Sequence, residues 1–332
     1  MRRSLKTGAA KIQEIEKVAQ RVESILELIG DTPILRLQRL PAEGSAEVWV
    51  KLESLNPGGS LKDRAALAMV EAAEDAGVLK PGDTIVEPTS GNMGIGLAQV
   101  AAVKGYRCVL VMPERRRSAH LALLRHFGAR VVLTPARLRM EGAIARAKSI
   151  VTENPRCFMP QQFANEANRA VHQEGTGAEI LRALGGAVDG FVAAVGTSGS
   201  LSGVGAALRE ANPATQLIAV EPSSSAVLSG EASGAHGIPG IGAGFVPPLF
   251  DTSLVDQVYR CAEEDALRCS RELARQEGLS AGLSAGAAVW GALRLAAELG
   301  PTRRVVTLLC DRWGDSPWGD KSALPAGLDF II

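Results

Sequence analysis

Short apolar runs alternate along the chain with longer stretches in which apolar residues recur every three or four positions. The short runs predict buried strands at Val48–Leu52, Thr84–Val86, Cys108–Met112, Val131–Leu133, Phe191–Val195, Leu217–Val220 and Val305–Leu309. The longer stretches predict helices at Lys62–Ala76, Gly94–Lys104, Ser118–Phe127, Glu141–Val151, Glu166–Leu184, Ser202–Ala211, Glu263–Gln276 and Ala285–Leu299. Because strands and helices alternate, we expect an α/β protein with mostly parallel, twisted sheets and helices on both sheet faces.

The length of the chain favours two such lobes. With 332 residues and a mass of 34.7 kDa it is longer than one small domain. We expect residues 1–48 to form an N-terminal helix and a crossing segment that packs on the larger lobe. Residues 49–156 are expected to form a smaller, mobile lobe, and residues 157–332 the larger lobe. Ligands should bind in the turns at the carboxyl ends of the strands.

An amphipathic pattern in residues 10–29 precedes the first predicted strand. Its apolar positions lie three or four apart, at Ile12, Ile15, Val18, Val22, Ile25 and Ile29. Gly30 is a typical helix end, so the pattern predicts one helix that packs on the body of the molecule or on a partner subunit. Four glutamates within the segment argue against a cleaved transit peptide.

Composition and charge exclude several classes of protein. Lys+Arg and Asp+Glu both number 36, so the chain lacks the basic excess typical of nucleic-acid binding. No apolar run approaches the roughly 18 residues of a membrane span, and no apolar signal core follows the basic start. The five cysteines form no CxxC pair and the four histidines no HxxxH pair, which argues against a disulfide framework and a metal site. We therefore expect a cytoplasmic protein that binds neither metal nor membrane.

Glycine is in excess, at 36 residues, and many glycines lie in turns between a predicted strand and a predicted helix. Backbone in such turns can approach an anion closely. The turn Asn56–Arg64 carries Gly58-Gly59, then Ser60 as a candidate cap, and then projects Lys62 from the first turn of a helix. Lys62 could form a Schiff base with an aldehyde cofactor, if its surroundings keep the amine deprotonated, or it could be a solvated surface lysine.

Three further turns offer hydrogen-bond donors to anions. Pro88–Gly96 suits a carboxylate or a phosphate, and Gly196–Ser200 suits a phosphate, without the GKS of a P-loop or a dinucleotide fingerprint. Gly282–Gly286 places Ser284 at a helix start, where it could also be an ordinary N-cap. Each turn alone has an ordinary structural explanation. Together they supply the parts that hold pyridoxal phosphate and an amino acid.

In these segments the sequence resembles the cysteine synthase (O-acetylserine sulfhydrylase) group of fold-type II pyridoxal-phosphate enzymes, relatives of cystathionine β-synthase. The resemblance runs from Ile29-Gly30-Asp31-Thr32-Pro33 to about Arg312. It includes Gln161-Gln162-Phe163 and Gly240-Ile241-Gly242-Ala243-Gly244-Phe245. It implies a two-lobed fold like that of the tryptophan synthase β subunit, pyridoxal 5'-phosphate as cofactor, a homodimer, and serine acetyltransferase as a partner.

The resemblance also assigns roles to single residues. It makes Lys62 the Schiff-base lysine and later the general acid/base, places Asn92 beside the ring hydroxyl, and places the Ser284 hydroxyl against the pyridine nitrogen. The phosphate loop corresponds to Gly196, Thr197, Ser198, Gly199 and Ser200. The substrate-binding residues correspond to Thr89, Ser90, Gly91, Asn92 and Met93, together with Gln162 and Gly242.

The implied reaction is a β-replacement, in which O-acetyl-L-serine and sulfide give L-cysteine and acetate through an aminoacrylate. A neutral serine on the pyridine nitrogen makes the ring a weaker electron sink than an aspartate would, which suits proton removal coupled to loss of a leaving group. The donor could instead be O-phosphoserine, and the nucleophile thiosulfate, homocysteine or an amine that gives a diaminopropionate. An alternative of another class is a non-catalytic partner or sensor with the same fold.

Several segments depart from the family pattern. Met93 replaces the usual threonine, and the arginines of Glu114–His120 are expected to be solvated. Cys310-Asp311-Arg312 resembles the B-type branch of the family, whereas Gly240–Phe245 resembles the A-type branch. The tail Leu328–Ile332 either enters an active site, with its terminal carboxylate in the substrate's place, or is a flexible or surface-packed end. These departures leave the identity of donor and nucleophile open.

Overall fold

The computed structural model describes residues 21–89, 91–114 and 118–312. Strands in these ranges are β1 (Ile34–Arg36), β2 (Glu47–Lys51), β3 (Thr84–Pro88), β4 (Arg107–Pro113), β5 (Arg130–Thr134), β6 (Cys157–Phe158), β7 (Gly190–Ala194), β8 (Gln216–Pro222), β9 (Gln257–Cys261) and β10 (Arg304–Leu308). The α-helices are α2 (Lys62–Asp75), α3 (Asn92–Lys104), α4 (Ser118–His126), α5 (Arg139–Glu153), α6 (Glu166–Val171), α7 (Ala178–Leu184), α8 (Gly199–Ala211), α9 (Glu263–Glu272) and α10 (Leu283–Leu299). Within the described ranges, no helix is both long enough and apolar enough to cross a membrane.

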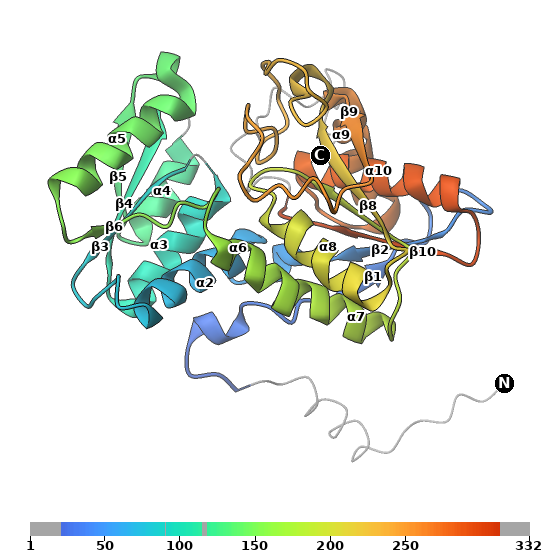
Figure 1. Ribbon diagram of the computed structural model, residues 1–332, viewed down its shortest axis with the longest axis horizontal. Helices are drawn as coiled ribbons and strands as arrows, with labels where there is room; N and C mark the ends of the chain where they lie inside the picture. Colours follow the sequence, from blue (N-terminus) through green and yellow to red (C-terminus); the bar gives the residue numbers. More distant parts are fainter. Residues whose placement is uncertain (1–20, 90, 115–117, 313–332) are drawn as a thin grey trace, which may run out of the picture.

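The strands form two sheets that lie side by side (Figure 1). The larger sheet has the order β1-β2-β10-β7-β8-β9 and the smaller sheet β5-β4-β3-β6. Neighbouring strands are parallel except for the pair β1 and β2. The predicted α/β class with mostly parallel sheets is therefore confirmed.

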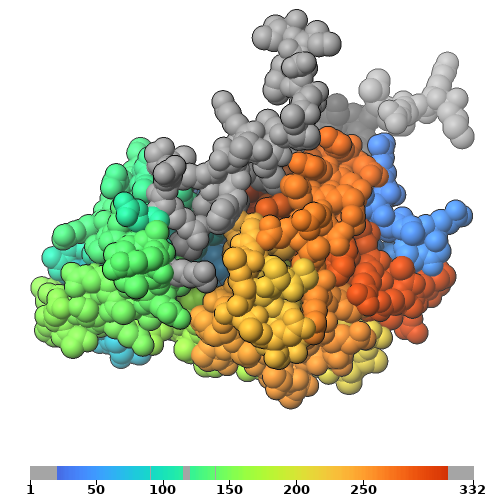
Figure 2. Space-filling view, turned by 90° about the horizontal axis from the view of Figure 1, so that it is seen from above, coloured from blue at the N-terminus to red at the C-terminus, as the bar shows by residue number. Residues whose placement is uncertain are grey.

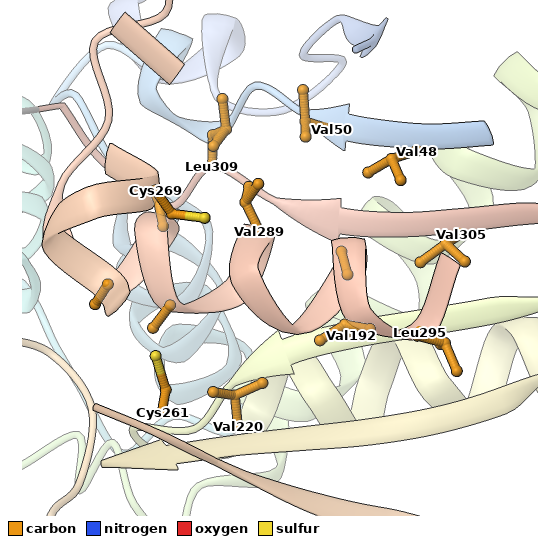
Figure 3. Close-up of a cluster of buried hydrophobic side chains, with 14 of the residues drawn as sticks. Val48, Val50, Val192, Val220, Cys261, Cys269, Val289, Leu295, Val305 and Leu309 are labelled. Atoms are coloured by element: carbon orange, nitrogen blue, oxygen red, sulfur yellow. The ribbon is translucent and has the colours of Figure 1, made fainter. Parts of the chain in front are cut away.

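Alternation along the strands of the larger sheet divides its side chains between two helix layers. On β7, Val192 faces a core that it shares with α9 and α10, whereas Phe191 and Ala193 face a core that they share with α7 and α8. Figure 3 shows the first of these cores, in which strand residues such as Val220 and Val305 lie alongside helix α10, which carries Val289. Because both faces are buried, these strands read as continuous apolar runs.

In the smaller sheet, too, side chains alternate between a helix layer on each face. Ile85 of β3 and Leu110 of β4 face a core built with α2 and α3, while Val86 and Val111 face a separate cluster with α5. Seen from above, the green segment around the smaller sheet and the yellow-to-red segment of the larger sheet form neighbouring bodies (Figure 2). The boundaries at residues 49 and 156 remain predictions. The sheets assign Glu47–Lys51 to the larger sheet and Cys157–Phe158 to the smaller one.

Two predicted helices contain a wider turn. The span Glu166–Leu184 is α6 and α7 joined by a π-helical segment, His172–Gly177, and α9 is extended by a second one, Leu273–Glu277. In the first segment a Cβ on Gly177 would lie 2.6 Å from Ala207 Cβ of α8. The helix therefore packs tightly against α8 at its irregular turn, a position where periodicity gives no signal.

The helix predicted for residues 10–29 is wrong over its described part. Residues 10–20 lie outside the described residues, and residues 21–24 are not helical. Ile25–Leu28 form a single 3₁₀ turn, which begins where the Ser24 hydroxyl accepts a hydrogen bond from Leu26 N at 3.2 Å. A serine bonded to nearby backbone competes with helix continuation, and only Leu26 packs against a core.

Candidate active site

A cavity of about 300 Å³ lies between the two sheets. Segments that follow the carboxyl ends of β3, β6, β7 and β10 line it, together with the starts of α2, α3 and α10. This is where parallel sheets are expected to bind ligands. The Gly-rich turns singled out in the sequence thus meet at one cavity.

Lys62 begins α2 and lines the cavity. The Ser60 hydroxyl accepts a hydrogen bond from Lys62 N at 3.2 Å, and Asp63 accepts one from Gly58 N at 2.6 Å. A Cβ on Gly58 would lie 2.6 Å from Asp63 Oδ1, so the close turn requires glycine. Burial lowers the pKa of the Lys62 amine, although the neighbouring Cys310 and Asp311 act in the opposite direction. The solvated-lysine alternative is therefore not supported.

The start of α3 presents backbone donors to the same cavity. Its N-cap is Gly91, and no side chain caps this end. The Thr89 hydroxyl accepts a hydrogen bond from Gly91 N at 3.3 Å, and Thr89, Gly91, Asn92 and Met93 all line the cavity. Met93 is 2% exposed and also belongs to the core beside the smaller sheet. Ser90 lies outside the described residues.

Gln162 enters the cavity wall from the segment after β6. The buried carboxylate of Glu87 accepts hydrogen bonds from Gln161 N at 3.0 Å and Gln162 N at 3.1 Å. The Gln162 amide donates to Pro88 O at 3.4 Å. Glu87 therefore joins the end of β3 to the segment that carries Gln162.

The loop after β7 contributes Gly196, Thr197 and Ser200 to the cavity. A Cβ on Gly196 would lie 2.3 Å from Gly240 O, so only glycine fits there. Ser198 has a left-handed φ of 71° and its hydroxyl lies 3.2 Å from that of Ser202. Ser198 and Gly199 do not line the cavity, unlike the other loop residues. Ser198 is the N-cap of α8 and Gly199 is its first residue. No side chain caps this end, and its N–H groups suit an anion.

Ser284 and Gly242 also line the cavity. The N-cap of α10 is Gly282 and no side chain caps this helix, so the ordinary N-cap alternative for Ser284 is not supported. Gly242 has a φ of 63°, and a Cβ on it would lie 2.6 Å from His236 Nε2. Glycine is thus required there by both backbone conformation and space.

Comparison with known proteins identifies the family. Residues 25–311 match the family model "Pyridoxal-phosphate dependent enzyme". The chain is 48% identical over 289 residues to cysteine synthase of Staphylococcus aureus, covering 87% of this chain and 93% of the relative. It belongs to the pyridoxal-phosphate-dependent enzymes of the cysteine synthase group. The resemblance drawn from the sequence is thereby confirmed.

Solved structures of this family share the fold. Cysteine synthase (OASS) from Entamoeba histolytica superimposes with a TM-score of 0.84 at 38% identity, covering 88% of both chains. O-ureido-L-serine synthase superimposes with a TM-score of 0.84 at 44% identity, and the match covers 88% of this chain and 92% of that chain. The O-acetylserine-dependent cystathionine β-synthase from Helicobacter pylori superimposes with a TM-score of 0.85 at 34% identity, and the match covers 90% of this chain and 97% of that chain.

The cavity fits the cofactor of the family. Pyridoxal phosphate needs an amine, phosphate donors and groups for its ring. The chain offers Lys62, the uncapped start of α8, and Asn92 and Ser284. Added Cβ atoms on Gly196 and Gly199 would collide with Gly240 O and Asn168 Oδ1, at 2.3 and 2.4 Å, so the loop needs glycine at both positions in order to pack against the rest of the protein. The N–H groups at the start of α8 have no side-chain cap and are suited to a phosphate.

Several polar residues of the cavity were not proposed as site residues by the sequence analysis, among them His236, Cys310 and Asp311. His236 donates from Nε2 to Gly242 O at 2.9 Å, which holds the loop containing Gly242. Cys310 and Asp311 follow β10, and the Asn92 amide donates to Asp311 Oδ2 at 2.8 Å. The position of Asp311 just beyond a predicted buried strand could have indicated it, since strand ends collect ligand-binding residues. His236 lies in an irregular segment and gave no such signal.

Proposed function

We propose that the chain is a cysteine synthase that converts O-acetyl-L-serine and sulfide to L-cysteine and acetate. The observation that carries this proposal is the position of Lys62, whose amine lies in a cavity that it shares with the start of α3 and the loop after β7. An amine of lowered pKa is available as a nucleophile and as a base. The similarity to the S. aureus cysteine synthase supports the same assignment.

The role of each residue follows from its position in the cavity. When bound, pyridoxal phosphate supplies an aldehyde for amines and an electron sink that acidifies the α-hydrogen of an amino acid. Thr89, Gly91, Asn92 and Met93 offer backbone and side-chain donors to the substrate carboxylate, and Gln162 offers its amide from the opposite segment. We place Ser90 in the same loop by resemblance alone.

Lys62 then moves the protons. Its amine takes the proton from Cα as acetate leaves Cβ, and it returns a proton to Cα after sulfide has added to Cβ. The lowered pKa of Lys62 favours the neutral amine that the first step needs. Thr197, Ser200 and the N–H groups at the start of α8 hold the phosphate throughout, and Ser284 offers a neutral hydroxyl to the ring nitrogen.

A spectral titration tests the proposal. Purified protein should carry a visible absorbance band from its cofactor, and Lys62→Ala should lose that band. O-acetylserine should change the band, whereas O-phosphoserine and serine should not, and sulfide should restore it with release of cysteine. A wild-type protein that stays colourless after reconstitution, or that responds to none of these donors, contradicts the proposal. A response to O-phosphoserine alone would show that O-phosphoserine, and not O-acetylserine, is the donor.

Assembly and location follow from the same proposal. We propose a cytoplasmic homodimer in which a smaller, mobile lobe at residues 49–156 closes over the substrate, and serine acetyltransferase as a partner. The cysteines, all in the described part of the chain, are free, which supports a reducing compartment. Light scattering with and without the acetyltransferase tests the assembly. The first half of the apolar stripe, up to residue 20, the arginines 115–117 and the tail 328–332 lie outside the described residues.

A further inference from the structure

The short helix α6 carries a buried amide between the two sheets (Figure 1). It packs against α2, which begins with Lys62, and against α8, which follows the loop after β7. Asn168 of α6 is 0% exposed. An added Cβ on Gly199 would lie 2.4 Å from Asn168 Oδ1 and 2.8 Å from Asn168 O, so the start of α8 lies directly against this residue. Packing therefore holds the Asn168 side chain in place.

The amide of Asn168 joins two segments that face the cavity. Its Nδ2 donates to Gln162 O at 2.7 Å and to Thr197 Oγ1 at 3.1 Å. Gln162 follows β6 and Thr197 follows β7, and both residues line the cavity. A backbone carbonyl can only accept hydrogen bonds, so Gln162 O determines which end of the amide is the NH2 group. The second hydrogen of that group then points at Thr197.

The hydroxyl of Thr197 receives hydrogen bonds from the protein side. Besides Asn168 Nδ2, Gly199 N donates to it at 3.5 Å. A hydroxyl has two acceptor lone pairs and one hydrogen, and both lone pairs face these donors. Among the described residues, no acceptor takes the hydrogen of this hydroxyl. Because Thr197 is 4% exposed and lines the cavity, its O–H is left to point into the cavity.

We propose that Asn168 is a positioning residue that makes the Thr197 hydroxyl a fixed donor to the cofactor phosphate. By donating to the oxygen from the protein side, the amide directs the O–H into the cavity before the phosphate arrives. A donor that is oriented in advance needs no reorganisation when the anion binds. This inference rests on the phosphate site proposed at Gly196–Ser200, and it is independent of which amino acid and nucleophile react.

The substitution Asn168→Asp tests this inference, because aspartate has nearly the same shape and presents an acceptor to Thr197. This holds even if the carboxyl group is protonated on the side of Gln162 O. The Thr197 O–H should then turn away from the phosphate. We expect the ratio of the Kd of pyridoxal phosphate to the Kd of pyridoxal, which lacks the phosphate, to rise about tenfold. Fluorescence titration of the full-length apoprotein with each compound measures both constants.

Two single variants accompany this test. Asn168→Ala removes the amide without adding a charge, and it should raise the same ratio by a smaller factor, since the hydroxyl is then free to rotate. Asn212→Asp is the matched control. Asn212 lies outside the cavity wall and its amide donates to Val188 O at 3.2 Å, so the same change there should leave the ratio unchanged.

Double variants show whether the effect passes through the hydroxyl. In a Thr197→Val background, which lacks the hydroxyl, Asn168→Asp should change the ratio less than about twofold. In a Thr197→Ser background, which keeps it, the rise of about tenfold should remain. An undiminished rise in Thr197→Val overturns the inference, because the charge of the aspartate would then act on the phosphate directly. Equal rises of both Kd values in Asn168→Asp and Asn168→Ala also overturn it, because lost structure would explain them.

The binding measurements need no turnover. If O-acetylserine and sulfide give no cysteine while the ratio still responds to Asn168 through Thr197, the proposed function fails and this inference stands. If cysteine forms and the ratio does not respond, the inference fails and the proposed function stands.

Discussion

Glu87 illustrates how one buried carboxyl holds two parts of the cavity wall. It is 1% exposed, and both of its oxygens accept backbone hydrogen bonds from the segment that carries Gln162. Burial raises the pKa of Glu87 to about 7, although the bonds from Gln161 and Gln162 act in the opposite direction. The strained backbone of Gln161, with a φ of 58°, is kept in place by this arrangement.

The raised pKa of Glu87 predicts a dependence of stability on pH. Between about pH 4.5 and 7 the folded protein keeps a proton that the unfolded chain has lost, so the contribution of Glu87 is fully present below this window and is lost as pH rises through it. Glu87→Gln cannot titrate. Urea denaturation measures the free energy of unfolding of both proteins. The value for the wild type minus the value for the variant should fall by about 3 kcal/mol between pH 5 and pH 8. Parallel pH curves for the two proteins would contradict this.

At the residue scale, the sequence indicated the turn residues better than the groups that hold them. Lys62, Asn92 and Ser284 were found because each follows a Gly-rich turn between a strand and a helix. Asp311 was not proposed as a site residue, because its partner Asn92 lies 219 positions away in the sequence. This pairing arises only when the two sheets meet, and no local pattern records it. His236 was missed although its partner Gly242 is near in sequence, because both lie in an irregular segment without a periodic pattern.

At the scale of elements, a buried ionic cluster fixes the helix that carries Lys62. Arg64 of α2 donates to Glu53 at 2.7 and 2.9 Å and to Glu179 of α7 at 2.7 Å. Lys51 of β2 donates to Glu179 at 2.6 Å. Burial opposes ionisation of Glu179, but the bonds and charges of Arg64 and Lys51 outweigh it and lower the pKa of Glu179 to about 2. The cluster therefore ties α2 to the larger sheet through charged hydrogen bonds.

Glu179→Gln should loosen this attachment. Because the pKa of Glu179 is lower in the folded protein, its contribution is present above about pH 4.5 and is lost as pH falls toward 2. At pH 7 we expect the variant to lose about 3 kcal/mol of unfolding free energy, since it removes the carboxylate that pairs with Lys51 and leaves Arg64 with Glu53 alone. Urea denaturation measures the loss, which should shrink below about pH 4.

The exposed pair of Asp31 and Arg182 provides the matched control for that variant. Their side chains are 85% and 68% exposed, with a contact of 2.6 Å. Asp31 has a φ of 43°, a conformation that asparagine also tolerates. Asp31→Asn should therefore change stability by less than about 1 kcal/mol. Equal losses in the two variants would show that burial of the cluster contributes nothing.

Elements themselves were predictable where both faces of a strand or one face of a helix are apolar. Phe191–Val195 and Ala285–Leu299 lie within one or two residues of β7 and α10 for this reason. The short strand β6 pairs only through Cys157 and Phe158, too few residues to produce a pattern. Residues 21–29 carried a helical period, but no residue of Ile25–Leu28 is fully buried and Leu26 alone among these four packs against a core, so periodicity was insufficient there.

At the scale of the whole molecule, the cavity lies where two separately packed sheets meet. Thr89, Met93 and Gln162 come from the side of the smaller sheet, and Gly196 and Ser284 from the side of the larger one. A group bound to both sides ties the two sheets together, and it stabilises the folded chain by mass action. The cofactor is thus expected to act as a structural link as well as a reagent.

Removal of pyridoxal phosphate tests this link. Apoprotein should melt at a lower temperature than holoenzyme, and at a cofactor concentration of about 100 Kd the gain should be about 2.7 kcal/mol. Pyridoxal lacks the phosphate that the start of α8 binds, so it should restore only part of the gain. 4'-Deoxypyridoxine phosphate lacks the aldehyde that Lys62 needs, and it should restore another part. If pyridoxal alone gave the full gain, the loop Gly196–Ser200 would not hold the phosphate, and the two sheets would be joined through Lys62 only.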